Sequence, residues 1–294
     1  MQIVTQSTAK YSTTDHKHFT GVLCNADTLD SGVYRGYIDS YGGIHFDKID
    51  HGKSTMLEFP SLQQREVIEE IKEFWQKQVE YQTLGVTHKR GVLLYGEPGG
   101  GKTSVINILI KDIVEVRKGI VFDFRSPLVD IKSIQFFRKA EPTRPLLIIM
   151  EDIDALFGRD GDNHESAILN LLDGVMQIDN VVFLATSNYP EKLAARITDR
   201  PSRFDKVVHV GSPAKEDREF YIKHLISSLP TEKKRDIDLK QWVKDTDSLS
   251  VAHIKELVIS VMLYGKEYQD TLHNLDKMKH PLTVNGRKGT TGFK

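Results

Sequence analysis

Short apolar runs recur between residues 91 and 187 of this chain, and segments with helical spacing separate them. A continuous apolar run indicates a strand that is covered on both faces, as strands of parallel sheets are. The alternation of such strands with helices predicts a three-layer α/β domain with a mainly parallel sheet. The predicted strands span residues 92–95, 120–124, 146–150 and 181–185, and the predicted helices between them span residues 105–116, 131–139 and 166–175.

The residues before this domain follow other patterns. Apolar residues at helical spacing predict a core-facing helix over residues 62–79. Residues 33–38 and 44–46 flank a glycine-containing turn, which predicts a β-hairpin. We therefore expect residues 1–55 to form a loose arm followed by a small β-rich segment. Its tyrosines are expected to pack on a small sheet rather than to stack on nucleic-acid bases, because few basic residues lie near them.

Beyond residue 210 the strand pattern stops and helical spacing takes over. This change places a boundary after residue 212 and predicts a helical domain over residues 213–280. The last residues, 281–294, are basic and rich in glycine, and they predict a flexible tail. The predicted helices of this domain span residues 216–228, 239–244 and 251–270.

Composition narrows the class of protein without identifying it. The chain has 294 residues, 39% of them hydrophobic and 28% charged, as in ordinary globular proteins. A formal net charge of −1 gives no general argument for binding nucleic acid or an anionic membrane. Cys24 is the only cysteine, so no disulfide forms within the chain. Because we find neither a signal pattern nor an apolar run long enough to span a membrane, we expect a cytoplasmic protein without membrane association.

A glycine-rich loop joins the first predicted parallel strand to the helix that follows it. The loop has the pattern G-x-x-x-x-G-K-[ST], and it lies between a strand and a helix, as that motif requires. Glycines let backbone N–H groups approach a polyphosphate closely, Lys102 reaches the β- and γ-phosphates, and Thr103 is placed for Mg²⁺. The sequence therefore predicts binding of ATP and Mg²⁺. The predicted nucleotide-binding residues here are Gly96, Glu97, Pro98, Gly99, Gly100, Gly101, Lys102, Thr103 and Ser104.

Polar side chains follow two other predicted strands, at the sheet edge where ligands of parallel sheets bind. Glu151 and Asp152 follow the strand over residues 146–150, and Asn188 follows the strand over residues 181–185. One carboxylate of the pair is suited to hold the water shell of Mg²⁺, and the other to accept a proton from an attacking water. Asn188 is placed to orient that water. The alternative is that the two acids merely begin a solvated loop.

These motifs together resemble the AAA family of the AAA+ ATPases, over roughly residues 56–270. Residues 89–96 resemble that family's approach to Walker A, residues 146–156 its Walker B segment, and Asn188 its first sensor. The segment Arg200-Pro201-Ser202-Arg203-Phe204-Asp205 is similar to its arginine-finger segment, with serine in place of the usual glycine. The resemblance implies that Arg200 or Arg203 reaches the site of a neighbouring subunit in a ring, most often a hexamer, and leaves open which of them does.

The resemblance extends to the helical domain, which would be a lid over the nucleotide. His224 and Ala252 match positions that commonly line the ribose and adenine, and no counterpart of the second sensor arginine lies near Ala252. Within the family the chain is most similar to Bcs-type ATPases, which share the order Glu151-Asp152 and the helix over residues 166–175. By position, Glu151 would serve Mg²⁺ with Thr103, and Asp152 would activate water.

We therefore expect a ring ATPase that hydrolyses ATP and remodels, moves or disassembles a protein partner. The loop over residues 125–130 lacks the aromatic-hydrophobic-glycine motif of peptide-threading relatives, so axial threading is not expected. Two alternatives stay open. One is a nucleic-acid motor or loader, for which Lys132, Arg138, Lys139 and Arg144 give the local hint; the other is a nucleotide-gated scaffold with little turnover, which the reversed acidic pair allows.

Overall fold

A computed structural model of the chain describes residues 10–12, 17–22, 27–50, 62–157, 162–174, 178–189, 191, 193 and 202–278. The chain divides into two compact units. One unit comprises Met1–Gly96 and Lys102–Val210, and the other comprises Glu97–Gly101 and Gly211–Lys294. Each unit is described by itself.

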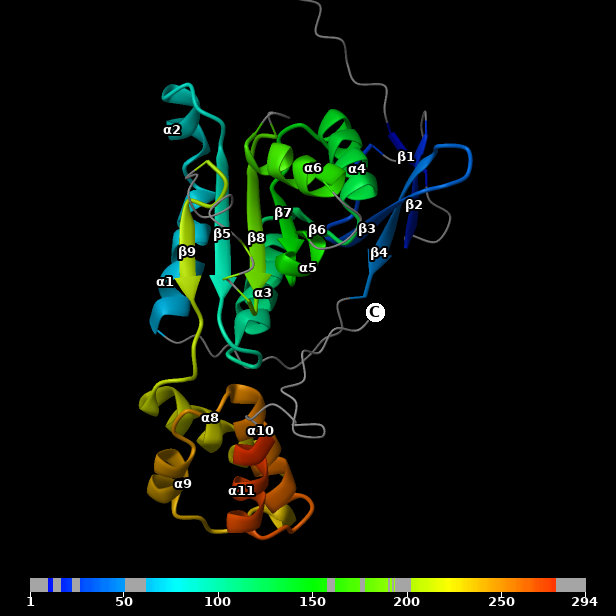
Figure 1. Ribbon diagram of the computed structural model, residues 1–294. Helices are drawn as coiled ribbons and strands as arrows, with labels where there is room; N and C mark the ends of the chain where they lie inside the picture. Colours follow the sequence, from blue (N-terminus) through cyan, green and yellow to red (C-terminus); the bar gives the residue numbers. More distant parts are fainter. Residues whose placement is uncertain are drawn as a thin grey trace, which may run out of the picture. The chain divides into compact units, whose positions relative to one another are not determined.

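The first unit is built on a single sheet whose described strands run in the order β1-β2-β4-β3-β6-β7-β8-β5-β9 (Figure 1). From β3 to β9 each strand is parallel to its neighbours apart from the β3–β4 pair, which confirms the predicted parallel sheet. The strands are β1 Lys10–Ser12, β2 His18–Val22, β3 Gly32–Ile38, β4 Ile44–Ile49, β5 Lys89–Tyr95, β6 Ile120–Asp123, β7 Leu146–Met150, β8 Val181–Ser187 and β9 Lys206–His209.

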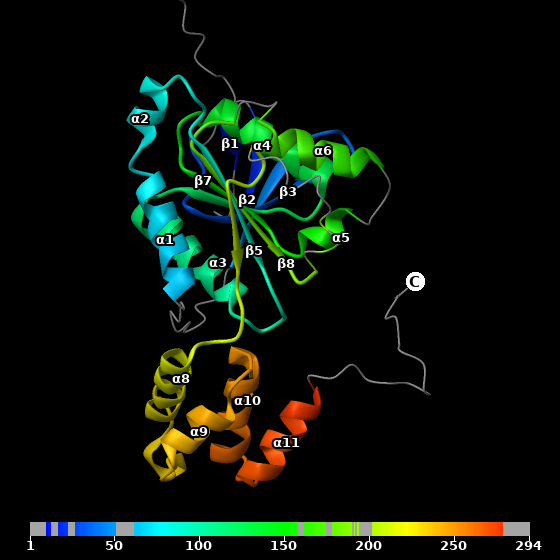
Figure 2. The ribbon, with the colours of Figure 1, turned by 60° about the vertical axis from the view of Figure 1, so that its left-hand side comes forward.

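Helices cover both faces of this sheet, which confirms the three-layer architecture (Figure 2). Because successive residues of a strand point to opposite faces, Phe122 and Ile148 pack towards one helical layer while Val121 and Leu147 pack towards the other. The first layer contains α4 Pro127–Ala140, α5 Ile153–Phe157 and α6 Asp162–Leu172. The second contains α1 Leu62–Phe74, α2 Gln78–Thr83, α3 Lys102–Lys111 and the π-helix η1 Asp112–Val116.

The N-terminal strands continue the main sheet instead of forming the small separate one that we expected. Strand β3 pairs in parallel with β6, with Val33 opposite Val121. The predicted hairpin is present as β3 and β4, closed by a turn in which the Asp39 carboxylate accepts from the Gly43 N–H at 2.8 Å. Tyr34 is fully buried, and its hydroxyl donates to the Asp30 carbonyl at 2.7 Å. This tyrosine therefore has the packing role that we favoured. Tyr37 and Tyr41, for which we expected the same role, are 41% and 96% exposed, so the prediction is wrong for Tyr41 and only partly met by Tyr37.

Two predicted helices are interrupted. The helix expected over residues 62–79 ends at Phe74, where the buried ring of His88 stacks on the Phe74 ring and places its Nε2 2.8 Å from the Phe74 carbonyl oxygen. The helix expected over residues 251–270 is also split, because Gly265 adopts a left-handed conformation (φ 68°) that ends a helix. Nothing between residues 62 and 79 reveals the first interruption, whereas Gly265 is a sequence signal for the second that we did not use.

The second unit is helical. Its helices are α8 Lys215–Ser227, the 3₁₀ turn η3 Thr231–Lys233, α9 Leu239–Asp245, α10 Val251–Met262 and α11 Tyr268–Met278. Buried Arg218 joins two of them, since it donates to the Val243 carbonyl at 3.1 Å and pairs with Asp247 at 2.9 Å. Ser250 accepts from the His253 N–H and caps α10. Among the helices described in either unit, none has both the length and the apolar character that a membrane crossing needs.

Candidate functional site

The glycine-rich loop leaves the carboxyl end of β5, a central strand of the sheet, and leads into α3. Three of its glycines have positive φ, namely Gly96 (144°), Gly99 (81°) and Gly101 (105°). At Gly96 a Cβ would also lie 2.3 Å from the Val210 carbonyl oxygen, so no larger residue fits there. The loop thus has the backbone that turns N–H groups towards an anion, beside the N-terminus of a helix that is itself suited to bind anions.

Lys102 is the first residue of α3 and is almost completely buried. Its ammonium donates to the Gly96 carbonyl at 2.7 Å, which joins the start of α3 to the first residue of the loop. Burial lowers the pKa of Lys102, and the negative charges of Asp152 and Asp154 oppose that shift. The ammonium therefore lies within the field of the acidic residues that follow β7. Next to it, the Thr103 side chain is exposed and Ser104 is half-buried.

Asp152 lies where the ends of β7 and β8 meet. Its backbone is left-handed (φ 49°), an uncommon conformation for a residue with a side chain. The Asp152 N–H donates to the Thr186 hydroxyl at 3.1 Å, and the Asn188 side-chain amide donates to the Asp152 carboxylate at 2.9 Å. Asp154 accepts from Ser187 at 2.7 Å. The structure thus brings Asp152 and Asn188 together, and Asn188 fixes the direction of the carboxylate.

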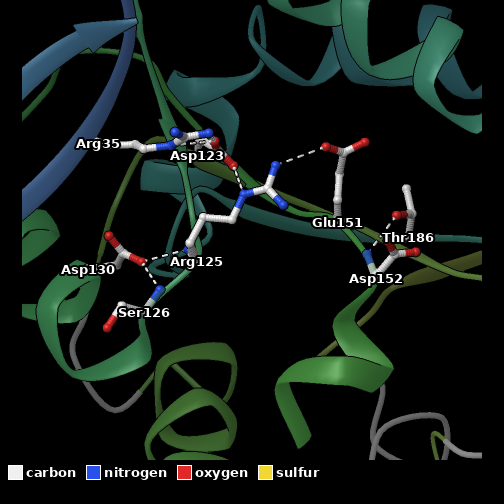
Figure 3. Close-up of polar contacts among 8 residues, drawn as sticks. All are labelled: Arg35, Asp123, Arg125, Ser126, Asp130, Glu151, Asp152 and Thr186. Atoms are coloured by element: carbon white, nitrogen blue, oxygen red, sulfur yellow. Dashed lines mark hydrogen bonds and ion pairs between the residues drawn. The ribbon is translucent and has the colours of Figure 1, made fainter. Parts of the chain in front are cut away.

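Glu151 takes part in a different set of contacts (Figure 3). Its carboxylate lies 3.3 Å from Nη2 of Arg125, whose Nε donates to Asp123 at 2.7 Å. Arg35 of β3 donates to the other oxygen of Asp123, from Nε at 2.8 Å and from Nη2 at 2.5 Å. We call Arg35, Asp123, Arg125 and Glu151 the Arg35–Glu151 network. Sequence reasoning missed its first three members; the available signal was an acid within the apolar run 120–124, followed by an arginine.

Asp130 of α4 holds the backbone that carries Arg125. One oxygen of its carboxylate accepts from the N–H of Arg125 at 2.7 Å and from the N–H of Ser126 at 2.6 Å (Figure 3). The side chain is buried, and burial raises the pKa of Asp130 to about 6, with a further contribution from the negative charge of Asp123. The position of the Arg125 backbone thus depends on a buried carboxylate.

The arginine-finger segment is described only from residue 202, so Arg200 lies outside the described residues. Arg203 is 5% exposed and binds Asp173 through two hydrogen bonds, at 2.8 and 2.9 Å. Asp205 accepts from the Gly91 N–H at 2.7 Å, and a Cβ on Gly91 would lie 2.1 Å from the Arg203 carbonyl oxygen. Residues 203–205 are therefore packed against β5, and the Arg203 guanidinium is engaged within its own chain.

The two predicted lid contacts belong to the helical unit. His224 is half-buried in the last turn of α8, with Nε2 3.2 Å from the Ser228 hydroxyl. Ala252 is exposed in the first turn of α10. Nothing in the surroundings of either residue within this unit contradicts the role that the resemblance implies, and both assignments stay predictions.

Two residues of the basic group that suggested nucleic acid have other functions. Arg138 donates to the carbonyls of Arg144 (2.6 Å) and Asn180 (2.9 Å), and Arg144 pairs with Glu141 at 2.5 Å. Arg144 also binds the Leu29 carbonyl, while Glu141 accepts from the Leu29 N–H at 2.9 Å. Arg144 thus binds the segment that leads into β3, and Arg138 joins two loops of the α/β unit, so the local hint of a nucleic-acid surface loses half of its members.

The oxygen donors at this edge fit Mg²⁺ bound together with a nucleotide. Among the residues that the structure describes, no three His, Cys, Asp or Glu side chains form a preformed metal cage. Mg²⁺ does not need one, because it usually takes one or two protein oxygens and completes its shell with phosphate and water. The Thr103 hydroxyl and the Glu151 carboxylate are donors of that kind. The Lys102 ammonium and the N–H groups of the glycine loop together suit the phosphates.

Comparison with known proteins gives a family match in the same part of the chain. Residues 92–212 match the family described as "ATPase family associated with various cellular activities (AAA)". The chain is 28% identical over 248 residues to the "ATPase family gene 2 protein" of Schizosaccharomyces pombe, which covers 75% of this chain and 30% of that protein. It is 30% identical over 217 residues to "Mitochondrial inner membrane i-AAA protease supercomplex subunit YME1" of Saccharomyces cerevisiae, covering 68% and 28%.

A Bcs-type protein is among the matches, as the resemblance predicted. The "Probable mitochondrial chaperone BCS1-A" of Dictyostelium discoideum is 29% identical over 208 residues, covering 66% of this chain and 48% of that protein. The chain spans less than half the length of each of these relatives. The match therefore concerns only a part of each of these relatives.

Proposed function

Because the chain belongs, through residues 92–212, to the AAA family of ATPases, we propose that it binds and hydrolyses ATP as one subunit of a ring. The observation that carries the proposal is the meeting of three elements at one sheet edge. The glycine loop with Lys102 follows β5, the pair Glu151 and Asp152 follows β7, and Asn188 follows β8. Neighbouring parallel strands place these groups together, as ATP hydrolysis requires.

Each group has a separate role in the proposed reaction. The loop amides and the Lys102 ammonium bind the phosphates, and Lys102 leaves the Gly96 carbonyl to do so. Thr103 and Glu151 would hold Mg²⁺, which when bound neutralises charge on the β- and γ-phosphates. Asp152 accepts a proton from the attacking water, and its hydrogen bond with Asn188 fixes the oxygen that does so. For His224 and Ala252 the family resemblance implies contacts with the ribose and adenine.

We assign the contact with the neighbouring subunit to Arg200. The doubly hydrogen-bonded pair of buried Arg203 and half-buried Asp173 supports this choice, because moving Arg203 to another chain would leave Asp173 without that guanidinium. Arg203 then keeps the segment on β5, and Arg200 stabilises charge on the transferring phosphoryl group.

The proposed work of the ring is to remodel or move a protein. The printed names of two relatives, a chaperone and a protease subunit, describe proteins that act on other proteins, and they support a protein client for this chain as well. A nucleic-acid partner is less well supported, because Arg138 and Arg144 already form hydrogen bonds with Asn180 and Glu141 of the same chain. A scaffold with little turnover stays a second candidate, because the contact of Glu151 with Arg125 occupies a group that the reaction needs.

The test is the substitution Asp152→Asn, measured beside the matched exposed control Asp236→Asn in the helical unit. We expect Asp152→Asn to bind a fluorescent ATP analogue as the natural protein does and to lose turnover by a factor of about 100 or more, as expected when a general base is removed. The control should keep both properties. Full hydrolysis by Asp152→Asn would show that the base is assigned wrongly, and negligible turnover by the natural protein would favour the scaffold.

A further inference from the structure

Three members of the Arg35–Glu151 network lie on one face of the sheet. In register, Val33 of β3 is opposite Val121 of β6, so Arg35 follows on the same face as Asp123. Asp123 is opposite Ile149 of β7, and Glu151 continues that face beyond the strand end. Arg125 bridges the gap between the two acids. The network therefore connects an N-terminal strand, which lies outside the matched residues 92–212, with the acidic pair.

The contacts within the network are unequal. Asp123 is nearly buried, with 8% of its side chain exposed, and it binds both guanidiniums at 2.5 to 2.8 Å. Arg125 reaches Glu151 only with its remaining Nη2, at 3.3 Å. Arg125 is thus held mainly by Asp123 and offers Glu151 a weaker contact. The strength of that contact depends on how much of the Asp123 charge Arg35 already satisfies.

The charges of the network sum to zero, with two arginines and two carboxylates. Without Arg35, a single guanidinium would serve both carboxylates, and the network would carry one net negative charge. Without the Asp123 charge, the two guanidiniums would face Glu151 alone, and the network would carry one net positive charge. A change of charge near a metal site alters its attraction for a dication. About half of each arginine side chain is exposed, so salt screens part of this effect.

We propose that Arg35 is a positioning residue for the ATP site, which acts through Asp123 and Arg125 on the negative charge available at Glu151. By this route the N-terminal strands set how strongly the nucleotide-bound site takes up Mg²⁺. The inference rests on the proposed function, since it assigns Glu151 to the metal. It gives the N-terminal segment, whose sequence indicates no role, an effect on the chemistry farther along its own sheet.

The experiment measures binding of a fluorescent non-hydrolysable ATP analogue in EDTA and again in excess Mg²⁺. The dissociation constant in EDTA divided by that in Mg²⁺ reports how strongly the nucleotide complex takes up the metal. This ratio does not depend on turnover. We expect Arg35→Gln to raise this ratio about two- to five-fold and Asp123→Asn to lower it by a similar factor, with both effects shrinking at high salt. Arg35→Lys keeps the charge and should stay close to the natural protein.

Lys17→Gln is the matched control, because it removes one positive charge from an exposed residue beside β2 and has no part in the network. An equal ratio for Arg35→Gln, Lys17→Gln and the natural protein would overturn the inference and leave the proposed function intact. If Arg35→Gln and Asp123→Asn changed the ratio in the same direction, the inference would also be overturned. A general loosening of the fold would change the ratio in one direction for both variants, whereas the inference requires opposite changes. Absence of nucleotide binding by the natural protein would overturn both proposals.

Discussion

At the residue scale, Asp130 shows how burial disfavours the charged form of a carboxyl group. Its carboxylate is buried and has a pKa of about 6, whereas an aspartate in an unfolded chain titrates near pH 4. The folded state therefore holds the proton more tightly than the unfolded chain does. The stability that this protonation contributes is fully present below about pH 4, and it is lost as the pH rises through about 6.

Asp130→Asn should remove this dependence. Asparagine keeps an oxygen that can accept from the N–H groups of Arg125 and Ser126, yet it carries no charge to bury. We expect the melting temperature of the natural protein, relative to the variant, to fall between pH 4 and pH 7.5, by an amount equivalent to roughly 2 kcal/mol in the free energy of unfolding. Parallel curves for the two proteins across that range would contradict the assignment.

Residues whose places in the fold follow from local spacing were the ones that the sequence could locate. The glycine loop, Lys102 and the acidic pair lie within short segments whose order follows from strand, turn and helix. The missed contacts join distant positions: Arg35 and Asp123 are 88 residues apart, and Arg203 and Asp173 are 30 apart. Their pairing depends on which strands are neighbours, and no local pattern contains that information.

At the scale of elements, apolar strands were predicted well and interruptions poorly. Strand β7 begins and ends as expected, because a continuous apolar run of five residues between polar segments is too short for a helix and fits a strand covered on both faces. Strand β9 was missed, since it is a short edge strand in which half-buried and exposed residues alternate. The end of α1 was misplaced because a ring from residue 88 determines it, and nothing between residues 62 and 79 signals that contact.

The packing of the arginine segment on β5 leads to a prediction about one glycine. In Gly91→Ala the new Cβ would lie 2.1 Å from the Arg203 carbonyl oxygen, so the backbone there must move. We expect a loss of about 1 to 3 kcal/mol in the free energy of unfolding, which is typical of overpacking, together with reduced ATP turnover. Gly32→Ala is the control, because Gly32 has no positive φ and its added Cβ would meet only the flexible Lys48 side chain. Equal stability of the two variants, by thermal denaturation, would contradict this account.

At the scale of the whole molecule, the proposed ring divides each ATP site between two chains. Arg200→Ala and Asp152→Asn should each abolish turnover, one by removing the contact given to a neighbour and the other by removing the base. Mixed in equal amounts, the two variants should regain about a quarter of the natural activity, because random assembly places an intact Asp152 beside an intact Arg200 at that frequency.

The mixture must be dissociated and reassembled before turnover is measured. Arg203→Ala offers the contrast: if Arg203 holds its own segment in place, mixing it with Asp152→Asn should recover less activity than Arg200→Ala does. A ring that fails to form with ATP, shown by a monomeric mass at full turnover, would contradict the shared site. No recovery from the mixture of the Arg200 and Asp152 variants would contradict the assignment of Arg200.

The parallel pairing of β3 with β6 has a consequence for anyone who dissects this protein. The strands before residue 50 occupy the outer flank of β6, whose residues are all buried. A fragment trimmed to residues 92–212 would leave the N–H and C=O groups along that side of β6 without partners. An exposed apolar edge strand of this kind pairs with other chains and aggregates. A fragment for expression should therefore include β3 and β4 as well as the matched residues 92–212.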